Sequence, residues 1–429
     1  MRSNDSRFFR ALTRFPIRGF AGAITLALVL GALVVSQRER GAGPDDAFEA
    51  STVPSLAIVA RTAPEPATPA APRNPPTRAI DASTPPPLTI ADAASEPEQL
   101  AVVPEDAFIT YLDPGEGVGA NELGRIPILM YHAFVFSEEN TDDWTLTFDQ
   151  FREQLDWLVA NDYVMVGMNS IISRDFEIPA GKKPVVLTFD DASGGQFRLQ
   201  QAADGGLEVN PDTAVAIIEE YKQAYPEFAG PAFFAVLPDH CFFFPDDNDP
   251  STCEERLQWL VDNGYEIGNH TMEHMNLTDA SRDDFEYQVH GPTEWFGERI
   301  SGPNDLTDVL ALPFGAYPAQ ADIRALLFDG MQVGEEFWVP ALILEVGASP
   351  ARSPFHVEWT PNLSRYNTEP TIFWQWAESM DSGETVVFVS DGDASTVTVP
   401  EGWEEALNEE LIAEDGRRIV VEATGTPAA

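Results

Sequence analysis

Short apolar runs alternate with amphipathic segments over most of the chain. Residues 185–189 are a continuous apolar and β-branched run, which is typical of a strand buried on both faces of a parallel sheet. Residues 147–160 instead place their apolar side chains at helical spacing behind a threonine that can cap a helix. The expected strands are 126–131, 164–166, 185–189, 233–237, 265–267, 309–312, 341–346 and 386–389, and the expected helices are 147–160, 212–225, 254–263 and 281–299.

The alternation of strands and helices predicts one α/β domain in which helices cover a parallel sheet. We assign this domain to residues 106–429, because no second composition change follows. In a β/α barrel, which is one form of such a sheet, functional side chains lie at the carboxyl ends of the strands.

The first 105 residues have a different pattern. Residues 1–18 carry five arginines, and residues 19–36 carry no charge, close to the lower limit of roughly 17–25 residues for a spanning helix. We interpret 19–36 as an uncleaved transmembrane signal-anchor, with the leader 1–18 in the cytoplasm and the remainder outside. A cleaved signal peptide, and hence a secreted protein, is the alternative. Residues 37–105 are rich in Pro and Ala and lack a sustained period, which predicts a disordered linker.

Charge restricts the possible partners. The chain has 25 basic and 70 acidic residues and a formal net charge of −45. Its field repels polyanions, so nucleic acid is excluded as a partner. The cytoplasmic membrane is an expected partner only through the apolar segment 19–36.

Two adjacent carboxylates end the run at 185–189. Neighbouring residues at a strand end point to different sides, so Asp190 and Asp191 can have different roles, one with a cation and one with a reacting atom. An ordinary acidic turn is the alternative.

Two histidines follow the expected strand at 265–267. His270 and His274 are four residues apart, and on one helical turn both imidazoles would face the same side. Together with one carboxylate they would form a three-ligand metal set with an open coordination position.

These motifs carry a family resemblance. Thr188-Phe189-Asp190-Asp191, the His270–His274 pentapeptide and Leu312-Pro313-Phe314-Gly315 resemble, in order and spacing, the first three motifs of the NodB-type polysaccharide deacetylases, carbohydrate esterase family 4. Residues 126–132, which end in His132, resemble the first strand of many members. The resemblance implies a distorted (β/α) barrel with fewer than eight strands and covers the chain from about residue 121 onward.

The resemblance also implies roles for residues. It makes Asp191, His270 and His274 the metal ligands and Asp190 the catalytic base. Zinc suits two imidazoles best, and cobalt or nickel fits the same ligands. The turn Pro313-Phe314-Gly315 would hold the oxyanion through the Phe314 N–H, and an ordinary loop turn is the alternative reading.

Two departures from the family pattern bear on catalysis. Many members have Arg shortly before the Pro-Phe-Gly turn, where this chain has Ala311 and Leu312. Arg365 resembles an arginine of other branches and could orient Asp190. An exposed helper arginine is the alternative. The family's general-acid histidine ends a late strand as Leu-x-His. The corresponding strand here is expected at 386–389 and has no histidine, so we expect His132, or second Asp391, to act as the acid.

The leading hypothesis is a metal-dependent hydrolase that removes N-acetyl or O-acetyl groups from a cell-envelope or extracellular polysaccharide. A catalytically silent glycan-binding module and a small-molecule amidase or esterase are the rivals. The tryptophans expected to stack on sugars, unless they belong to the core, are Trp295, Trp338, Trp374 and Trp376.

The chain has two cysteines, Cys241 and Cys253. If this part lies outside the cytoplasm, a disulfide can close the loop between them, and two free thiols are the alternative. Their spacing matches no Cys-x-x-Cys metal pattern.

Overall fold

A computed structural model describes residues 107–113, 115–238, 240–242, 251–302, 304–347 and 349–423. The expectations for the leader at 1–18, the anchor at 19–36 and the linker at 37–105 therefore lie outside the described residues. Within the described ranges, no helix combines the length and apolar character that crossing a membrane requires.

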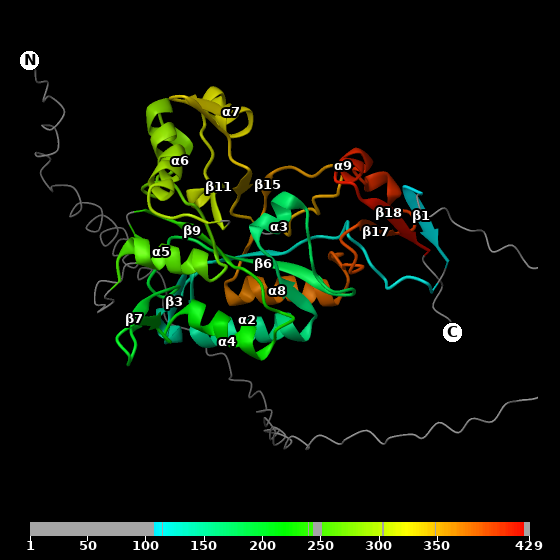
Figure 1. The fold of residues 1–429 in the computed structure, drawn as a ribbon, viewed down its shortest axis with the longest axis horizontal. Coiled ribbons are helices and arrows are strands. Elements are labelled where there is room, and N and C mark those ends of the chain that lie inside the picture. The colour runs from blue at the N-terminus through cyan, green and yellow to red at the C-terminus, as the bar shows by residue number, and fades with distance from the viewer. Residues whose placement is uncertain are drawn as a thin grey trace, which may run out of the picture. The chain divides into compact units, whose positions relative to one another are not determined.

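A parallel sheet forms the centre of the domain (Figure 1). Its strands are ordered β15-β14-β11-β10-β9-β6-β2-β16, and β5 is attached to β6. Most of the strands lie where the apolar runs predict them. The bounds are β2 (Ile128–Tyr131), β5 (Tyr163–Met165), β6 (Lys183–Phe189), β9 (Phe233–Val236), β10 (Glu266–Asn269), β11 (Asp305–Ala311), β14 (Leu342–Leu344), β15 (Asn362–Leu363) and β16 (Tyr366–Asn367).

The sheet curls because its two edges belong to one short segment. β15 pairs with β14 at one edge, and β16 pairs with β2 at the other. Only Ser364 and Arg365 separate the two strands along the chain. The expectation of an α/β fold with a curled, barrel-like parallel sheet is confirmed, but the expected count of fewer than eight strands is wrong, because the curled sheet has nine among the described residues.

The two faces of the sheet belong to two hydrophobic clusters. On β6, Leu187 and Phe189 pack in the cluster that includes the surrounding helices, whereas Val186 packs in the other. Because side chains alternate along a strand, an apolar residue at every position is needed to fill both sides. This explains why the strands appear in the sequence as continuous apolar runs.

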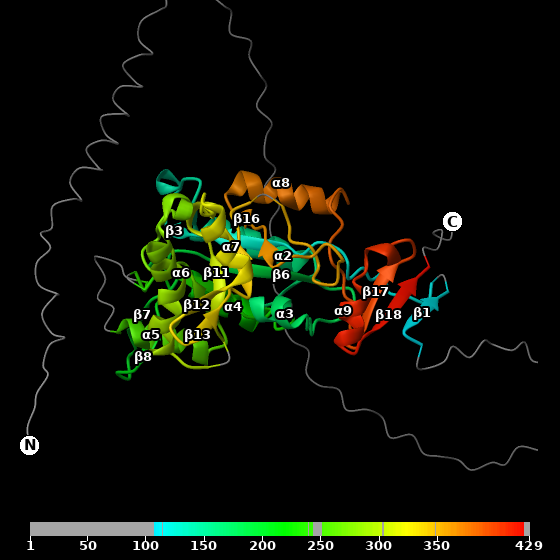
Figure 2. The same cartoon turned by 90° about the horizontal axis from the view of Figure 1, so that it is seen from above.

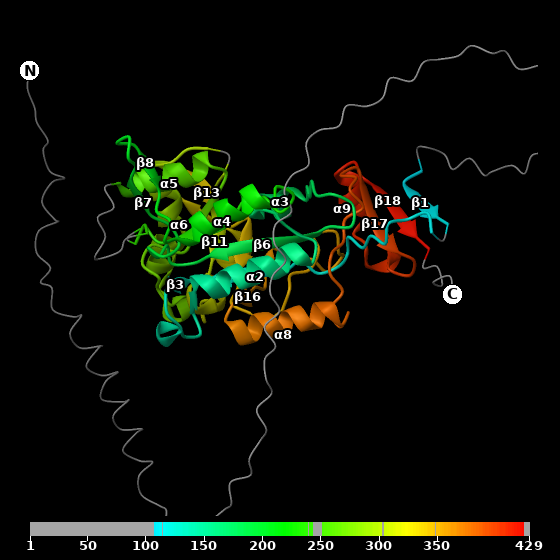
Figure 3. The same ribbon diagram turned by 90° about the horizontal axis from the view of Figure 1, so that it is seen from below.

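Helices cover the outside of the sheet, and α2 lies beside α8 (Figure 3). The Trp157 ring of α2 is 5.9 Å from the Phe373 ring of α8. Thr147 begins α2 with a complete capping box, in agreement with the sequence. The helices are α2 (Phe148–Ala160), α3 (Met168–Ser173), α4 (Ala214–Ala224), α5 (Cys253–Asp262), α6 (Arg282–Gly297), α7 (Ala321–Asp329), α8 (Pro370–Asp381) and α9 (Glu409–Glu414).

A second parallel sheet, which the sequence analysis missed, joins the two ends of the domain (Figure 2). β18 (Arg418–Glu422) lies between β1 (Ile109–Leu112) and β17 (Thr396–Pro400). Two short antiparallel hairpins, β7 (Leu199–Gln201) with β8 (Leu207–Val209) and β12 (Met331–Val333) with β13 (Glu336–Trp338), and the parallel pair β3 (Ala133–Val135) with β4 (Thr145–Thr147) complete the strands of the described residues.

The expected strand at 386–389 is wrong. This segment makes only isolated bridges, antiparallel from Val389 to Asn121 and parallel from Val387 to Arg125. The segment 362–367 takes the last position in the curled sheet instead, because β15 and β16 fill the space between β14 and β2.

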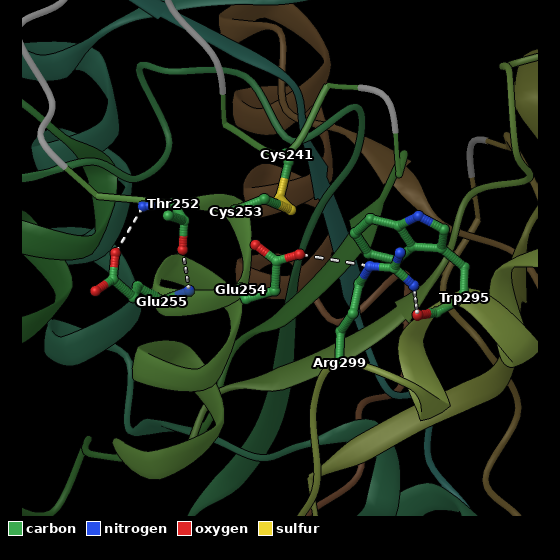
Figure 4. The surroundings of a disulfide bond; sticks show 7 residues. All are labelled: Cys241, Thr252, Cys253, Glu254, Glu255, Trp295 and Arg299. Carbon is green, nitrogen blue, oxygen red and sulfur yellow. Dashed lines mark hydrogen bonds and ion pairs between the residues drawn. A yellow bond between two sulfur atoms is a disulfide. The ribbon is translucent and has the colours of Figure 1, made fainter.

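Cys241 and Cys253 form a disulfide, with their Cα atoms 5.6 Å apart (Figure 4). Cys253 is the first residue of α5, and Thr252 caps that helix through a capping box with Glu255. The disulfide therefore ties the loop after β9 to the beginning of α5.

Candidate metal centre and catalytic site

The candidate residues follow parallel strands of the same sheet, so they gather at one end of it. His132 follows β2, Asp190 and Asp191 follow β6, and His270 follows β10. Together with Trp144, His274, Leu312, Phe314 and Val346, they line one cavity of about 290 Å³. The structure brings together all of the predicted site residues except Asp391. Arg365 belongs to the site through its hydrogen bonds to Asp190.

The loops that carry the site hold an unusual backbone conformation. Nine non-glycine residues of the described ranges have a positive φ, and five of them belong to these loops. Such conformations cost about 1–3 kcal/mol each and persist where the surroundings fix them. The five are Asp191 (74°), Ala192 (52°), Thr271 (68°), His274 (53°) and Phe314 (59°).

The expected helical turn at His270–His274 is wrong. Thr271 and His274 have left-handed backbone angles, and the segment is an irregular loop. The two imidazole rings nevertheless meet, with their centroids 4.9 Å apart. The pairing that helical spacing predicted is therefore achieved by a loop that β10 positions.

Asp191, His270 and His274 fit a single metal ion. The Oδ1 atom of Asp191 lies 3.2 Å from His270 Nε2 and 3.3 Å from His274 Nε2. Ligand atoms about 2.1 Å from a tetrahedral zinc ion lie roughly 3.4 Å apart, so the three atoms need little movement to share one ion. All three ligand atoms lie within 4.8 Å of one another.

The surroundings of the ligands favour the same use. His270 Nδ1 lies 2.9 Å from the main-chain oxygen of Ala311, which can only accept, so Nδ1 carries a hydrogen and the Nε2 lone pair of the neutral ring would face Asp191. Burial lowers the pKa of His274, and the neighbouring His270 adds to this effect. A neutral His274 is the form that binds metal.

Asp190 is a buried carboxylate held by a buried guanidinium. Arg365 donates from Nη1 and Nη2 to the two carboxylate oxygens, each at 2.8 Å, and both residues are almost fully buried. Arg365 also bonds Thr188 Oγ1 at 3.2 Å and the main-chain oxygen of Glu345 at 3.0 Å. Burial alone would raise the pKa of Asp190, but Arg365 and His270 hold it well below its ordinary value. Arg365 is thus not an exposed arginine, and it keeps Asp190 ionised.

His132 lies against Asp190 on the wall of the cavity. Its Nε2 atom is 3.9 Å from Asp190 Oδ2, and Nδ1 is buried with no hydrogen-bond partner among the described residues. Burial lowers the pKa of His132, although Asp190 and Asp191 oppose this shift. Gln196, which the sequence analysis missed, donates from Nε2 to the main-chain oxygens of His132 and Asp190 and so fixes the two loops together.

The Pro313-Phe314-Gly315 turn presents a main-chain donor to the site. No described residue accepts a hydrogen bond from the Phe314 N–H, whereas Gly315 and Ala316 donate back to Leu312 and Pro313. The Phe314 ring is 63% exposed and stands edge-on to His274, with centroids 4.6 Å apart. The turn is therefore not an ordinary surface loop but part of the wall of the cavity.

Asp391 lies at the other end of the sheet, and its assignment as a candidate acid is wrong. Its neighbour Ser390 forms hydrogen bonds with the main chain of Gly181 and Lys182, just before the first residue of β6. Asp190 instead follows the last residue of β6. Seven residues of strand separate the two ends by roughly 20 Å. The Asp391 carboxylate accepts hydrogen bonds from Thr396 Oγ1 at 2.6 Å and from Thr398 Oγ1.

The tryptophan at the site is Trp144, which the sequence analysis did not select. Its ring meets His132 edge-on, with centroids 4.8 Å apart, and is 43% exposed. It precedes β4 in the loop after His132, and nothing in the local sequence marks it, because only the folding of that loop brings it to the metal ligands. None of the four expected tryptophans lines this cavity, and two of them, Trp338 and Trp376, are core residues; the four are Trp295, Trp338, Trp374 and Trp376.

A family model for polysaccharide deacetylases matches residues 177–333. This range contains Asp190, Asp191, His270, His274 and the Pro313–Gly315 turn. Residues 177–333 are therefore similar in sequence to the polysaccharide deacetylase family. His132 and Arg365 lie outside the matched range: His132 directly follows β2, and Arg365 lies between β15 and β16. No curated protein sequence matches the chain.

Solved structures of deacetylases are similar to this domain. The deacetylase PplD of Streptococcus pyogenes, solved with acetate, is 21% identical, with a TM-score of 0.40 and coverage of 56% of this chain and 91% of its own. The polysaccharide deacetylase BC0361 of Bacillus cereus is 17% identical, with a TM-score of 0.42 and coverage of 60% and 69%. A de-N-acetylase of Aggregatibacter actinomycetemcomitans is 17% identical, with a TM-score of 0.37 and coverage of 56% and 94%.

Proposed function

We propose that this chain is a metal-dependent hydrolase that removes N-acetyl or O-acetyl groups from a cell-envelope or extracellular polysaccharide. The observation that carries the proposal is the Asp191–His270–His274 set with the ionised Asp190 beside it. Zinc is the first choice of metal, and cobalt or nickel suits the same ligands.

The metal, when bound by these three residues, polarises a carbonyl oxygen and lowers the pKa of a nearby water. Asp190 is the group that takes the proton from the attacking water, and Arg365 holds it ionised and correctly turned for that task. The Phe314 N–H donates to the oxygen that becomes negative as the carbonyl carbon is attacked.

His132 is the group that returns a proton to the leaving amine or hydroxyl. It lies 3.9 Å from Asp190, on the same cavity wall, and its lowered pKa leaves it neutral before the reaction. A proton taken by Asp190 can therefore pass to His132 and then to the leaving group. Water and the acetylated sugar thus give acetate and a free amine or hydroxyl.

The dimensions of the cavity suit a small acyl group. Trp144, Leu312, Phe314 and Val346 form apolar walls around about 290 Å³, and Trp144 and Phe314 are partly exposed at its edge. An acetyl methyl group can lie among these walls while the sugar remains outside. The exposed rings favour a glycan over a small molecule that the cavity would enclose completely.

We also propose that residues 19–36 anchor the protein in the cytoplasmic membrane, with the catalytic domain outside the cell. The uncharged segment and the arginines before it support this topology. A cleaved leader would instead release the protein, and N-terminal sequencing of the mature chain distinguishes the two.

The direct test is acetate release from acetylated glucosamine oligomers by the purified full-length chain, with added zinc or with a chelator. We expect metal-dependent release that falls at least about 10²-fold in Asp190→Asn. Asp191→Asn should abolish both metal binding and release.

The family's missing Leu-x-His histidine favours one rival, the silent glycan-binding module. Bound metal and bound oligomer without any acetate release would establish that rival and refute the hydrolase.

A further inference from the structure

A second cavity lies at the opposite end of the sheet from the metal ligands. Its volume is about 500 Å³, and its wall includes Arg125, Arg352, His356 and Trp403. Arg125 stands three residues before β2, whereas His132 follows that strand. The six residues between them span roughly 20 Å, so this cavity is separate from the catalytic one.

Arg125 brings an unpaired charge into this cavity. Its side chain is partly buried, and no described residue forms a hydrogen bond or an ion pair with its guanidinium. Burial lowers the pKa of Arg125, and the neighbouring Arg352 lowers it further. The Glu358 carboxylate opposes these two effects from a distance but makes no ion pair with Arg125, so the partly buried Arg125 guanidinium has an unfilled requirement for an acceptor.

Arg352 and His356 present further donors. Arg352 pairs with Glu358 through Nη2 at 2.9 Å, and its Nη1 atom lies 3.4 Å from His356 Nε2. The Glu358 N–H donates to His356 Nδ1 at 3.0 Å, so a neutral ring carries its hydrogen on Nε2. The Nε2–H of His356 and the Nη1–H of Arg352 then point toward each other, and neither has an acceptor there.

The negative charges at the cavity do not fill this requirement. Glu358 is engaged by Arg352, and Glu384 is an exposed residue of the rim. In a chain with a formal charge of −45, two arginines and a histidine around one cavity are a local exception to the overall field. The Trp403 side chain supplies an apolar surface beside them.

We propose that this cavity binds an oxyanion, a carboxylate or phosphate group, through Arg125, Arg352 and His356. Guanidinium groups bind such anions through paired, charge-assisted hydrogen bonds. The anion would lie where the Arg352 and His356 donors meet and would neutralise Arg125. The tryptophan beside these donors suits an anion that is attached to a sugar or another organic group.

The proposal does not depend on the catalytic activity, because the two cavities share no residues. Its test is the change in melting temperature and the calorimetric binding of inorganic phosphate and of glucuronate to the full-length chain at constant ionic strength. We expect both anions to bind, and Arg125→Gln and Arg352→Gln each to weaken binding by about tenfold or more, because each removes charged hydrogen bonds.

Two controls isolate the site. Asp191→Asn removes anion binding at the metal ligands, and phosphate should bind this variant as it binds the wild type. Arg152→Gln removes an arginine that pairs with Glu220 on the surface, and it should also leave the affinity unchanged. Unfolding curves without anion show whether Arg125→Gln is folded; if it is not, Arg352→Gln, at the more exposed side of the cavity, carries the test.

Vesicles separate two sources of the phosphate group. Binding to phosphatidylglycerol vesicles but not to phosphatidylcholine vesicles, with competition by free phosphate, assigns the cavity to a lipid headgroup. Phosphate or glucuronate binding without vesicle binding assigns it to a soluble or glycan-borne anion. Failure of both anions to bind at millimolar concentration, or full affinity in both Arg125→Gln and Arg352→Gln, overturns the proposal.

Discussion

A carboxyl group is buried at each end of the curled sheet, and the pKa values of the two groups are shifted in opposite directions. Asp190, at the carboxyl end, has two hydrogen bonds from Arg365, and its pKa is held below the ordinary value. Glu122, at the amino end, has no cation beside it among the described residues; it accepts from the Thr398 N–H at 2.9 Å, from the Ser390 hydroxyl at 3.4 Å and from the main chain of Asp391. Burial, with the charge of Asp391, raises the pKa of Glu122 to about 8.

The difference shows that burial alone does not set the charge of these groups. Burial opposes the ionised form at both ends, and only the end with a buried cation overcomes it. The carboxyl end thus maintains an ionised base at neutral pH, whereas the amino end holds a carboxyl that is largely protonated. Of these two buried carboxyl groups, only Asp190 is therefore available as a charged base.

The largest effect is expected when the two candidates for the general acid are compared, His132 at the carboxyl end and Asp391 at the amino end. Replacing His132 by Gln should reduce kcat by about 10²- to 10⁴-fold, because a positioned acid contributes this much. Asp391→Asn, at the other end, should leave kcat unchanged. Steady-state acetate release measures both, and a larger loss in Asp391→Asn would reverse the assignment of the two ends.

The ion pair at the carboxyl end can be broken from one side. Arg365→Met leaves Asp190 buried without a cation, and we expect a loss of about 3–5 kcal/mol in the free energy of unfolding. The pKa of Asp190 should rise once the guanidinium is gone, so the acid limb of the kcat profile should move to higher pH. Urea denaturation and pH–rate profiles measure the two effects.

The double variant Arg365→Met/Asp190→Leu is the control for this loss. It removes both charges, and it should recover much of the stability that Arg365→Met loses. If the single variant is as stable as the wild type, the pair does not hold the carboxyl end together.

The disulfide supports the loop after β9 at the carboxyl end. Cys241→Ser with Cys253→Ser should cost about 3 kcal/mol of unfolding free energy, the usual size for a short closed loop. Reduction of the wild type should give the same change in the urea midpoint, and reduction of the double variant should give none. An unchanged midpoint in the double variant would show that the loop is held by its other contacts.

The smallest effect is expected at the amino end. The native pKa of Glu122, about 8, lies above the ordinary value of 4.5, so the folded state binds the extra proton between these values. Its contribution to stability is therefore complete below pH 4.5 and is lost as the pH rises through 8. Relative to Glu122→Gln, the wild type should lose on the order of 2 kcal/mol between pH 5 and pH 8.

Asp391→Asn is the matched variant for Glu122, because it removes the charge that helps to raise this pKa. It should lower the native pKa of Glu122, so the loss of stability should be smaller and should end at a lower pH, and unfolding at a series of pH values measures this change. Parallel pH profiles for the wild type and Glu122→Gln would contradict a protonated Glu122.

The sequence was sufficient for most strands of the curled sheet, for four of the eight helices of the described residues and for the Asp191, His270 and His274 set that could hold a metal. Continuous apolar runs gave the positions of β6 and β9, and a capped amphipathic pattern gave α2. It misplaced the last strand, because residues 386–389 and 362–367 are both compatible with extended structure, and only pairing with β2 and β14 decides between them. It also missed Trp144 and Gln196, whose roles depend on loop positions.

What the sequence determined by itself is the set of chemical groups and the strands that they follow: Asp190 and Asp191 after one strand, and His270 and His274 after another. Tertiary structure decided how those groups act. Closing the sheet through 362–367 placed Arg365 against Asp190 and carried Asp391 to the other end, and these contacts set the charge of each carboxyl. The reason is that a buried charge depends on its nearest partner in space, and that partner here lies 175 residues away along the chain.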